Sequence, residues 1–210
     1  MQLVGRLQIQ SKQKMVEFLN QEHVGRIATI DSNGYPQVIP MNFVFFNDAI
    51  YMHSHTRGEK LENIKANSKS GFEVDKELEF LPSYFSSPTD ASMADTLYIS
   101  IVIKGQSVIV QDPGEKSLAL NAMMKKYQPE GQYEPLCSEM DVLNYTAVIK
   151  VVPEEMTGKY KIGQHIKSES RAVLARLIQK RNSPSAKETL KIMGFEETPD
   201  GLKMVDEPVW

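Results

Sequence analysis

The chain has 210 residues, of which 41% are hydrophobic and 24% charged, the composition of a globular protein with one sizeable core and an appendage. Its net charge of −3 provides no bulk attraction to nucleic acid or to an acidic membrane. The single cysteine, Cys137, excludes an internal disulfide and fits a reducing compartment. There is neither a membrane-spanning apolar run nor the apolar segment of a signal peptide, so we expect a cytoplasmic protein.

The first third of the chain predicts a helix and then three strands. Ser11 is a suitable N-cap, and Met15, Phe18 and Leu19 follow at helical spacing. Turns at 31–34 (Asp-Ser-Asn-Gly) and 47–48 (Asn-Asp) separate strands at 26–30, 35–45 and 49–54. Prolines in the second strand place it at an edge of the sheet or at a bulge. Three strands linked by hairpins predict a small antiparallel sheet or barrel.

The middle of the chain continues the β pattern. We expect a helix over 58–66, a strand over 70–75, a long surface loop over 76–94 and a strand over 96–111. A bulge or sharp bend should interrupt this last strand at Gly105. The 76–94 loop is either a lid over a site or a mobile insertion. Asp112, Pro113 and Glu115 occupy the preferred positions of a helix start, and a strand over 145–152 follows that helix.

In residues 165–210 the sequence pattern changes from that of strands to that of amphipathic helices. It predicts a helical extension packed on a barrel domain of residues 1–164. Val173, Leu174, Leu177 and Ile178 mark one amphipathic helix, and Ser183-Pro184 begins a second that ends at Gly194. The many basic residues of 167–191 have almost no aromatic neighbours and lie opposite the apolar stripe. We therefore interpret them as a solvated helix face rather than a nucleic-acid contact.

Residues 50–64 form the most informative segment, because a strand runs into a hydroxyl- and cation-rich turn and then a helix. Such a junction can hold a phosphate through free backbone N–H groups and the positive end of the helix dipole. Ser54, Thr56, Arg57 and Lys60 add donors or charge. The alternative is that this segment only leads the chain out of a β-hairpin, and that its charged side chains face solvent.

Four pieces in this order resemble the FMN-binding split-barrel family, the pyridoxamine 5'-phosphate oxidase-like proteins, and especially its nitroimidazole-resistance branch. They are Gly25-Arg-Ile-Ala-Thr29, Pro40-Met-Asn-Phe-Val44, Ile50-Tyr-Met-His-Ser54 followed by Gly58-x-Lys60, and Tyr98-x-Ser100 followed by Gly105. The resemblance implies a mainly β fold, a six-stranded antiparallel Greek-key split barrel, assembled as a homodimer with FMN between the subunits.

The resemblance also implies which residues hold the cofactor. The phosphate site maps onto Ser54, Gly58 and Lys60, with Arg57 as a further candidate because Glu59 stands where the oxidases have a second arginine. The other implied contacts are Met41 and Asn42 beside the flavin ring, Ser100 reaching across from the partner subunit, and Lys159 and Lys161 near the phosphate or ribityl chain.

His53 is the predicted catalytic residue. Strand alternation places it on the face opposite Ile50 and Met52, which fill the barrel, and the matching position in the nitroimidazole-resistance branch is a histidine near the flavin. An imidazole there could donate a proton as an acceptor is reduced. The alternative is a histidine that only bonds a neighbouring loop.

The expected activity is reduction of a small nitro-aromatic or quinone-like acceptor, with NAD(P)H or another reductase as the donor. The alternatives are a non-catalytic flavin-binding or regulatory protein and a haem-handling protein that uses His165. Val38 and Phe43 replace basic residues of the true oxidases, so oxidation of pyridoxamine phosphate is not expected. His53 and His55 could share a face, but no further ligand completes a metal site, and Cys137 lacks the basic neighbour of a reactive thiol.

Overall fold

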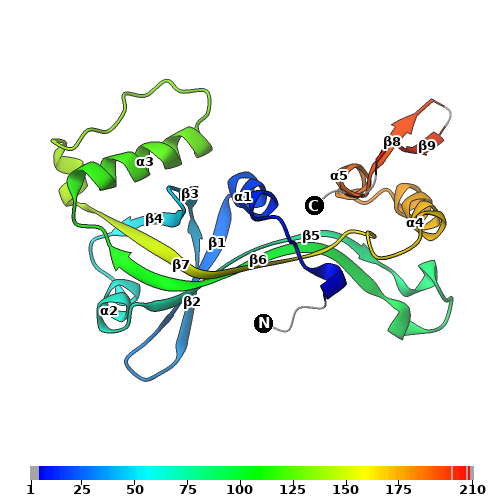
Figure 1. Cartoon of the computed structure of the whole chain (residues 1–210), viewed down its shortest axis with the longest axis horizontal. Coiled ribbons are helices and arrows are strands. Elements are labelled where there is room, and N and C mark those ends of the chain that lie inside the picture. The colour runs from blue at the N-terminus through cyan, green and yellow to red at the C-terminus, as the bar shows by residue number, and fades with distance from the viewer. Residues whose placement is uncertain (1–4, 200, 207, 209–210) are drawn as a thin grey trace. The chain divides into compact units, whose positions relative to one another are not determined.

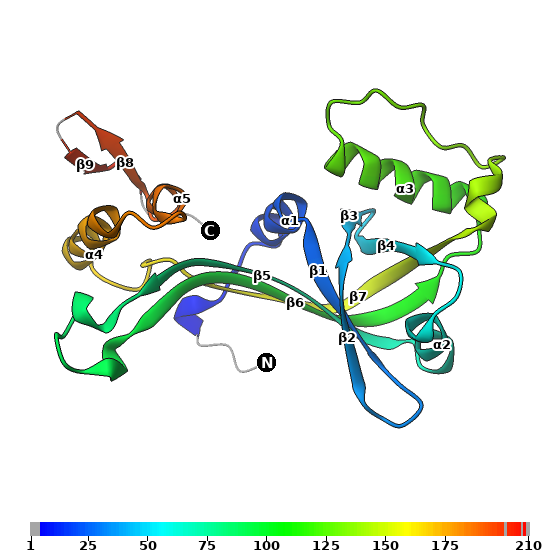
Figure 2. The ribbon, with the colours of Figure 1, turned by 180° about the vertical axis from the view of Figure 1, so that it is seen from behind.

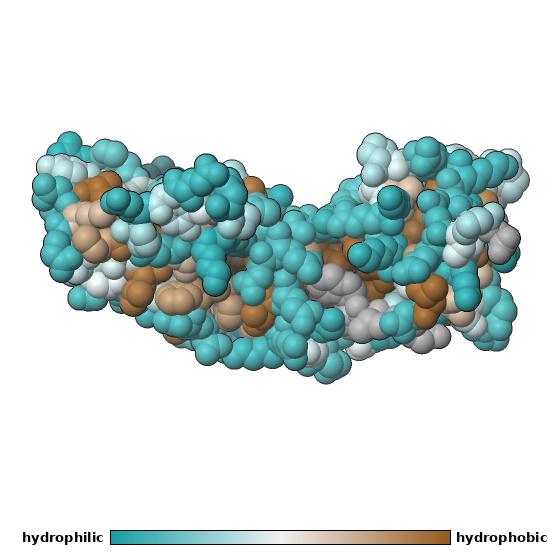
Figure 3. Space-filling view, turned by 90° about the horizontal axis from the view of Figure 1, so that it is seen from above, coloured by the Kyte–Doolittle hydropathy of each residue, from teal (hydrophilic) through white to brown (hydrophobic). Residues whose placement is uncertain are grey.

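The computed structural model describes residues 5–199, 201–206 and 208, and it divides into two compact units. Unit 1 comprises the described parts of Met1–Ser11, Asp75–Ser100 and Gly158–Trp210, and unit 2 comprises Lys12–Val74 and Ile101–Thr157. Figure 1 shows the elements in each unit. Hydrophobic side chains also reach the largely hydrophilic surface in several separate patches (Figure 3).

The fold is mainly β. One seven-stranded sheet has the order β2-β1-β5-β6-β7-β4-β3, one strand more than the six expected. Its strands are β1 (Val24–Ile30), β2 (Pro36–Asn42), β3 (Val44–Phe46), β4 (Ala49–His55), β5 (Lys69–Leu81), β6 (Asp95–Ile109) and β7 (Thr146–Lys161). The main helices are α1 (Lys12–Gln21), α2 (Glu59–Ala66), α3 (Pro113–Tyr127), α4 (Ser168–Arg181) and α5 (Ala186–Ile192), and β8 (Phe195–Thr198) and β9 (Gly201–Met204) form a separate hairpin.

The predicted strand over 35–45 is wrong in one respect, because it breaks at Phe43 into β2 and β3. Phe43 is fully buried, and its N–H donates to the Tyr127 hydroxyl (2.9 Å) instead of a strand neighbour. As a result β2 and β3 lie at opposite ends of the strand order, with β2 at the edge that its prolines predict. The Asn47–Asp48 turn is confirmed, since both residues have positive φ.

Two further predictions in the sheet need correction. Residues 76–81 are not loop but the end of β5, and 3-10 turns at Ser83–Phe85 and Ala91–Met93 occupy part of the remainder. β6 runs through Gly105 without interruption. That glycine is required by packing, because a Cβ there would lie 2.1 Å from the Val152 carbonyl oxygen of β7.

Unit 2 has its core between the sheet and its helices. Buried Phe18 and Leu19 of α1 confirm the predicted amphipathic helix. The predicted start of α3 is also confirmed, since the Asp112 carboxylate accepts from the Glu115 N–H at 2.7 Å. On the other side, α2 lies beside the β1–β2 hairpin (Figure 2), where its buried Asn63 donates to the hydroxyl of Thr29 at 3.2 Å.

In unit 1, a buried carboxylate of β5 helps to hold the C-terminal helices on this strand. Glu79 is 2% exposed and accepts from Arg181 Nη1 (2.9 Å), Ser185 Oγ (2.9 Å) and Ser183 Oγ. The two predicted helices are present as α4 and α5, but the β8–β9 hairpin that follows was not predicted. Its signal was the Pro-Asp-Gly sequence at 199–201, a frequent turn former.

Candidate functional site

The junction of β4 with α2 lies entirely within unit 2. Ile50 and Met52 are fully buried, which confirms that this face of β4 fills the core. Tyr51, on the opposite face, is also buried (2% exposed), because α3 packs over it with Ala119. His53 is the first exposed side chain of the strand. The strand therefore passes from a covered segment to an open one within two residues.

A hydrogen-bonded group fixes the covered segment. Tyr51 Oη and Lys150 Nζ each donate to Oε1 of Glu115 at 2.8 Å. Burial and the bond to Glu115 raise the pKa of Tyr51, while the bonds from Lys150 and Tyr51 lower the pKa of Glu115. Tyr51 stays a neutral donor and Glu115 a charged acceptor, so the start of α3 is held on β4 and β7.

The turn between β4 and α2 is shaped by its own polar groups. Ser54 Oγ donates to the carbonyl of His55 (2.9 Å), and the Arg57 N–H donates to Nδ1 of His55 (3.2 Å). Gly58 has φ 147°, a conformation that side chains rarely adopt, and its carbonyl accepts from the Leu61 N–H at 3.0 Å. No side chain caps α2, so the N–H groups of its first two residues, which precede Leu61, remain open to a ligand.

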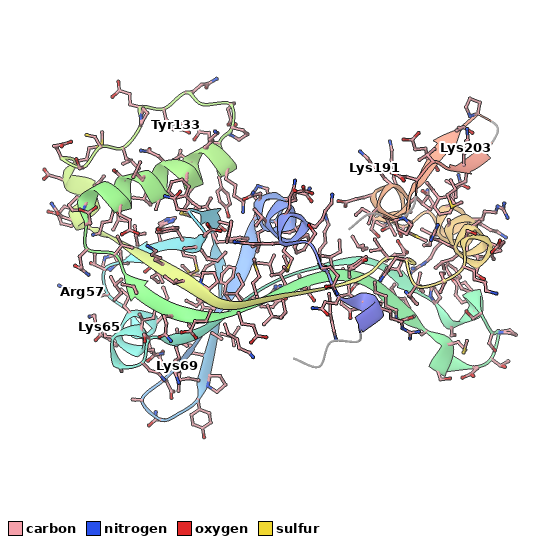
Figure 4. All side chains as sticks on the ribbon, in the orientation of Figure 1. Arg57, Lys65, Lys69, Tyr133, Lys191 and Lys203 are labelled. Atoms are coloured by element: carbon pink, nitrogen blue, oxygen red, sulfur yellow. The ribbon has the colours of Figure 1, made fainter. Side chains whose placement is uncertain are left out.

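Two cations at this turn are unpaired. Arg57 is exposed and Lys60 half-buried, and neither makes an ion pair within the described part of the chain. Lys65, on the same helix, instead binds Glu62 at 2.8 Å. Figure 4 shows Arg57 on the turn and Lys65 further along α2. Open N–H groups with two free cations fit an anionic group. Of the two acidic side chains in the first turn, Glu62 is paired with Lys65, and Glu59 is left to oppose an anion.

A protein-family model described as pyridoxamine 5'-phosphate oxidase matches residues 11–160, about 70% of the chain. The chain belongs to the pyridoxamine 5'-phosphate oxidase family. The match spans all seven strands of the large sheet except the last residue of β7, and it includes the β4–α2 turn. Among proteins of curated function, no significant match is found.

Solved structures share the fold of this family member. A candidate 5-nitroimidazole antibiotic resistance protein from Bacteroides thetaiotaomicron is 25% identical, with a TM-score of 0.62 over 73% of this chain and 86% of the other. The flavocytochrome Anf3 from Azotobacter vinelandii is 16% identical, with a TM-score of 0.63 over 77% of this chain and 72% of the other. An FAD- and haem-binding protein from Mycobacterium smegmatis is 16% identical, with a TM-score of 0.62 over 73% of each chain. The split-barrel fold class is thereby confirmed.

The remaining predicted cofactor contacts of this pyridoxamine 5'-phosphate oxidase family member lie elsewhere. Met41 (half-buried) and Asn42 (exposed) end β2, and Met41 pairs with Gly25 across the hairpin. Ser100, Lys159 and Lys161 belong to unit 1, and within unit 2 the structure groups the residues of the β4–α2 turn. Lys161 is also engaged, because its ammonium donates to the carboxylate of Asp95.

The sequence did not point to Lys126 or Tyr127, which support the strands from α3. Lys126 Nζ donates to the carbonyls of Leu19 (2.9 Å) and Phe43 (3.1 Å) and lies 3.9 Å from the centre of the Phe43 ring. Burial lowers the pKa of Lys126 to about 8, although the charge of Glu22 opposes the shift. No local motif marks these residues, because their partners lie more than 80 residues away.

Other kinds of site find no support among the described residues. No group of three or more His, Cys, Asp or Glu side chains there could hold a metal ion. Cys137 is exposed and forms no disulfide. None of the described helices has both the length and the apolar character needed to cross a membrane.

Proposed function

We propose that this protein binds FMN, with the phosphate at the β4–α2 turn, and passes electrons from NAD(P)H or another reductase to a small nitro-aromatic or quinone-like acceptor. The observation that carries the proposal is the open start of α2 beside two unpaired cations, Arg57 and Lys60. Membership of the pyridoxamine 5'-phosphate oxidase family and the fold of the candidate nitroimidazole resistance protein support it.

Each residue of the turn has a defined part in this proposal. Lys60 and Arg57 supply positive charge, the first N–H groups of α2 supply donors, and Gly58 permits the backbone conformation that exposes them. The bound flavin would supply the electron-transfer chemistry, while the protein orients it. His53, exposed at the end of β4, would hold the proton that the reduced acceptor takes up.

A homodimer is part of the proposal, because one face of the β1–β2 hairpin exposes several apolar side chains around the charged Arg26. Val24, Ile30 and Val38 are 46%, 38% and 58% exposed. The alternating burial of β1 and the pairing of Ala28 with Val38 place them on one face. A partner subunit would cover these side chains. Light scattering of the purified protein should give twice the chain mass of 23.8 kDa.

Oxidation of pyridoxamine phosphate is not the proposed activity. Phe43, where the oxidases carry a basic residue, is fully buried and packs edge-on against Phe72 with ring centres 5.1 Å apart. A residue so enclosed serves the core and is not available to a substrate phosphate.

The test of the phosphate site is a titration of FMN into matched lysine variants. Lys60→Ala should weaken FMN binding by about 1.5–3 kcal/mol, the value of a charge-assisted contact. Lys65→Ala removes a cation from the same helix, but one already paired with Glu62, and should leave the affinity within twofold. Equal losses in the two variants would show only a general charge effect and would remove Lys60 from the site.

A second experiment separates the enzyme from a flavin-binding or regulatory protein without turnover. NADPH is added anaerobically to the FMN-loaded protein and the visible flavin absorbance is followed. Rapid bleaching, reversed by a nitro-aromatic acceptor, supports the oxidoreductase. Tight FMN retention without bleaching by NADPH or by a flavin reductase supports the binding protein.

A further inference from the structure

A buried amide joins α2, the helix of the proposed phosphate site, to the sheet. Asn63 of α2 is only 6% exposed, although its side chain is polar. Its Nδ2 donates to Oγ1 of Thr29 in β1 (3.2 Å) and to Oε1 of Gln37 in β2 (3.3 Å). Thr29 is 1% exposed and lies directly opposite Gln37 in the β1–β2 pairing. The amide thus binds both strands of the hairpin at once, and we call these three side chains the α2 anchor.

The anchor can fix the rotation of α2 about its own axis. Leu61 and Ile64 of this helix are also buried, but apolar contacts are non-directional and hold a helix in place without setting its rotation. A hydrogen bond depends on direction, so the two bonds of Asn63 do set it. Among the described residues, no other polar side chain of α2 bonds to the sheet, since Lys65 and Glu62 bond to each other.

A rotated helix would leave buried polar groups without partners. The Asn63 amide would lose both acceptors while still lying against the core, and the enclosed Thr29 hydroxyl would lose its donor. Buried polar groups are nearly always hydrogen-bonded, because burying one without a partner costs free energy. The anchor therefore penalises every rotation of α2 except the one observed.

This rotation determines which charge of the first turn is turned toward the sheet. Lys60 precedes Asn63 by three residues, and residues at this spacing share one face of a helix. Accordingly Lys60 is half-buried, whereas the preceding Glu59 is exposed. Neighbouring residues are about 100° apart around a helix, so a rotation of that size would bring Glu59 to the place of Lys60. Part of that rotation would already move Lys60 and the first N–H groups away from an anion bound at the turn.

We propose that the α2 anchor is the positioning device of the phosphate site. Asn63, held by Thr29 and Gln37, keeps α2 in the rotation that presents Lys60 and the first two N–H groups to the phosphate of FMN. The anchor acts through the helix and does not itself contact the cofactor. This inference rests on the proposed function, because it requires that the phosphate binds at the β4–α2 turn.

The test compares two substitutions of Thr29 by calorimetric titration with FMN and with riboflavin. Thr29→Val keeps the shape of the buried side chain but removes the acceptor. It should weaken FMN binding by about three- to tenfold, because a smaller fraction of molecules holds α2 in the binding rotation, and should leave riboflavin binding unchanged. Thr29→Ser keeps the hydroxyl and loses a methyl group. It should lower the free energy of unfolding but bind FMN as the wild type does.

Unchanged FMN affinity in Thr29→Val would overturn the proposal. Equal losses of FMN affinity in the two variants would do so as well, since the loss would then follow stability and not the hydrogen bond. An equal loss for riboflavin would show that the anchor acts on the whole fold. Should Thr29→Val not fold, Gln37→Met removes the other acceptor from a half-buried position and should weaken FMN binding in the same selective way.

A double-mutant cycle identifies the group that the anchor positions. In the Lys60→Ala background, Thr29→Val should reduce FMN affinity by a smaller factor than in the wild type, because the positioned cation is gone. Fully additive losses would overturn the positioning of Lys60. If the wild type prefers FMN over riboflavin and Lys60→Ala removes this preference while Thr29→Val keeps it, only the anchor proposal fails. If the wild type shows no preference, the phosphate site fails and the anchor proposal with it.

Discussion

The two ends of β4 use similar side chains in opposite ways. At its start, Tyr51 lies under α3 and shares Glu115 with Lys150, so these three polar side chains are bonded to one another. Just beyond its end, Arg57 and Lys60 have no ion-pair partner among the described residues. The comparison indicates that a cation already paired within the fold is not available to a ligand, whereas an unpaired cation is. Substitutions at the two ends should therefore separate stability from binding.

The largest effect is expected where the packing leaves no room. In Gly105→Ala the new Cβ would lie 2.1 Å from the Val152 carbonyl oxygen, so β6 and β7 must separate. The free energy of unfolding, measured by urea denaturation, should fall by about 3 kcal/mol or more. Lys104→Ala is the neighbouring control, because it removes an exposed pair with Glu155 that is worth under about 1 kcal/mol. Equal stability of the two variants would contradict the close approach of these strands.

A substitution at the open end of β4 should change the rate of catalysis and leave the free energy of unfolding unchanged. His53→Ala should retain FMN but slow acceptor reduction by about 100-fold, the lower range for a general acid. Steady-state turnover with a nitro-aromatic acceptor measures the effect, and added imidazole should restore part of the rate. Unchanged turnover would make His53 a structural residue.

At the covered end, the substitution Glu115→Gln should change stability and not cofactor binding. The free energy of unfolding at pH 7 should fall by about 1–2 kcal/mol, because Tyr51 and Lys150 lose a charged acceptor, while FMN affinity stays unchanged. The folded state lowers the pKa of Glu115, so its contribution is complete above about 4.5, the value in the unfolded chain, and is lost as the pH falls further. The difference in the free energy of unfolding between wild type and variant at pH 7 should therefore shrink as the pH falls below about 4. A constant difference at both pH values would contradict this assignment.

The smallest effect is expected at Glu59, an acidic side chain in the first turn of α2 that would oppose a bound anion. Glu59→Gln should tighten FMN binding by up to about 1 kcal/mol, the scale of a charge at a helix end. Riboflavin, which lacks the phosphate, should bind both proteins equally in the same calorimetric titrations. A gain for riboflavin as large as that for FMN would mean that Glu59 acts on the ring or on the fold.

Local signals predicted much of this molecule. The helix start at Asp112, the Asn47–Asp48 turn and the edge position of β2 depend on neighbouring residues, and the structure has them. The break at Phe43 depends on Tyr127, 84 residues away, and could not be seen locally. Likewise, strand alternation placed Tyr51 and His53 on one face, but only the packing of α3 decides that the first is buried and the second exposed.

An ion pair between residues far apart in the chain also limits what the sequence at the end of β7 can predict about cofactor contacts. Lys161 was a candidate for the phosphate or ribityl chain because of its sequence context. Asp95, which holds its ammonium, lies 66 residues earlier in the chain. Sequence spacing identifies a cation, but only the fold determines whether that cation is already neutralised.

The most direct test of the account compares the affinities of the wild-type protein for FMN and riboflavin by calorimetry at low ionic strength. If the β4–α2 turn holds the phosphate, FMN should bind at least about tenfold more tightly, since a charge-assisted contact is worth about 1.5–3 kcal/mol. Equal affinities would contradict the central claim that this turn is a phosphate site.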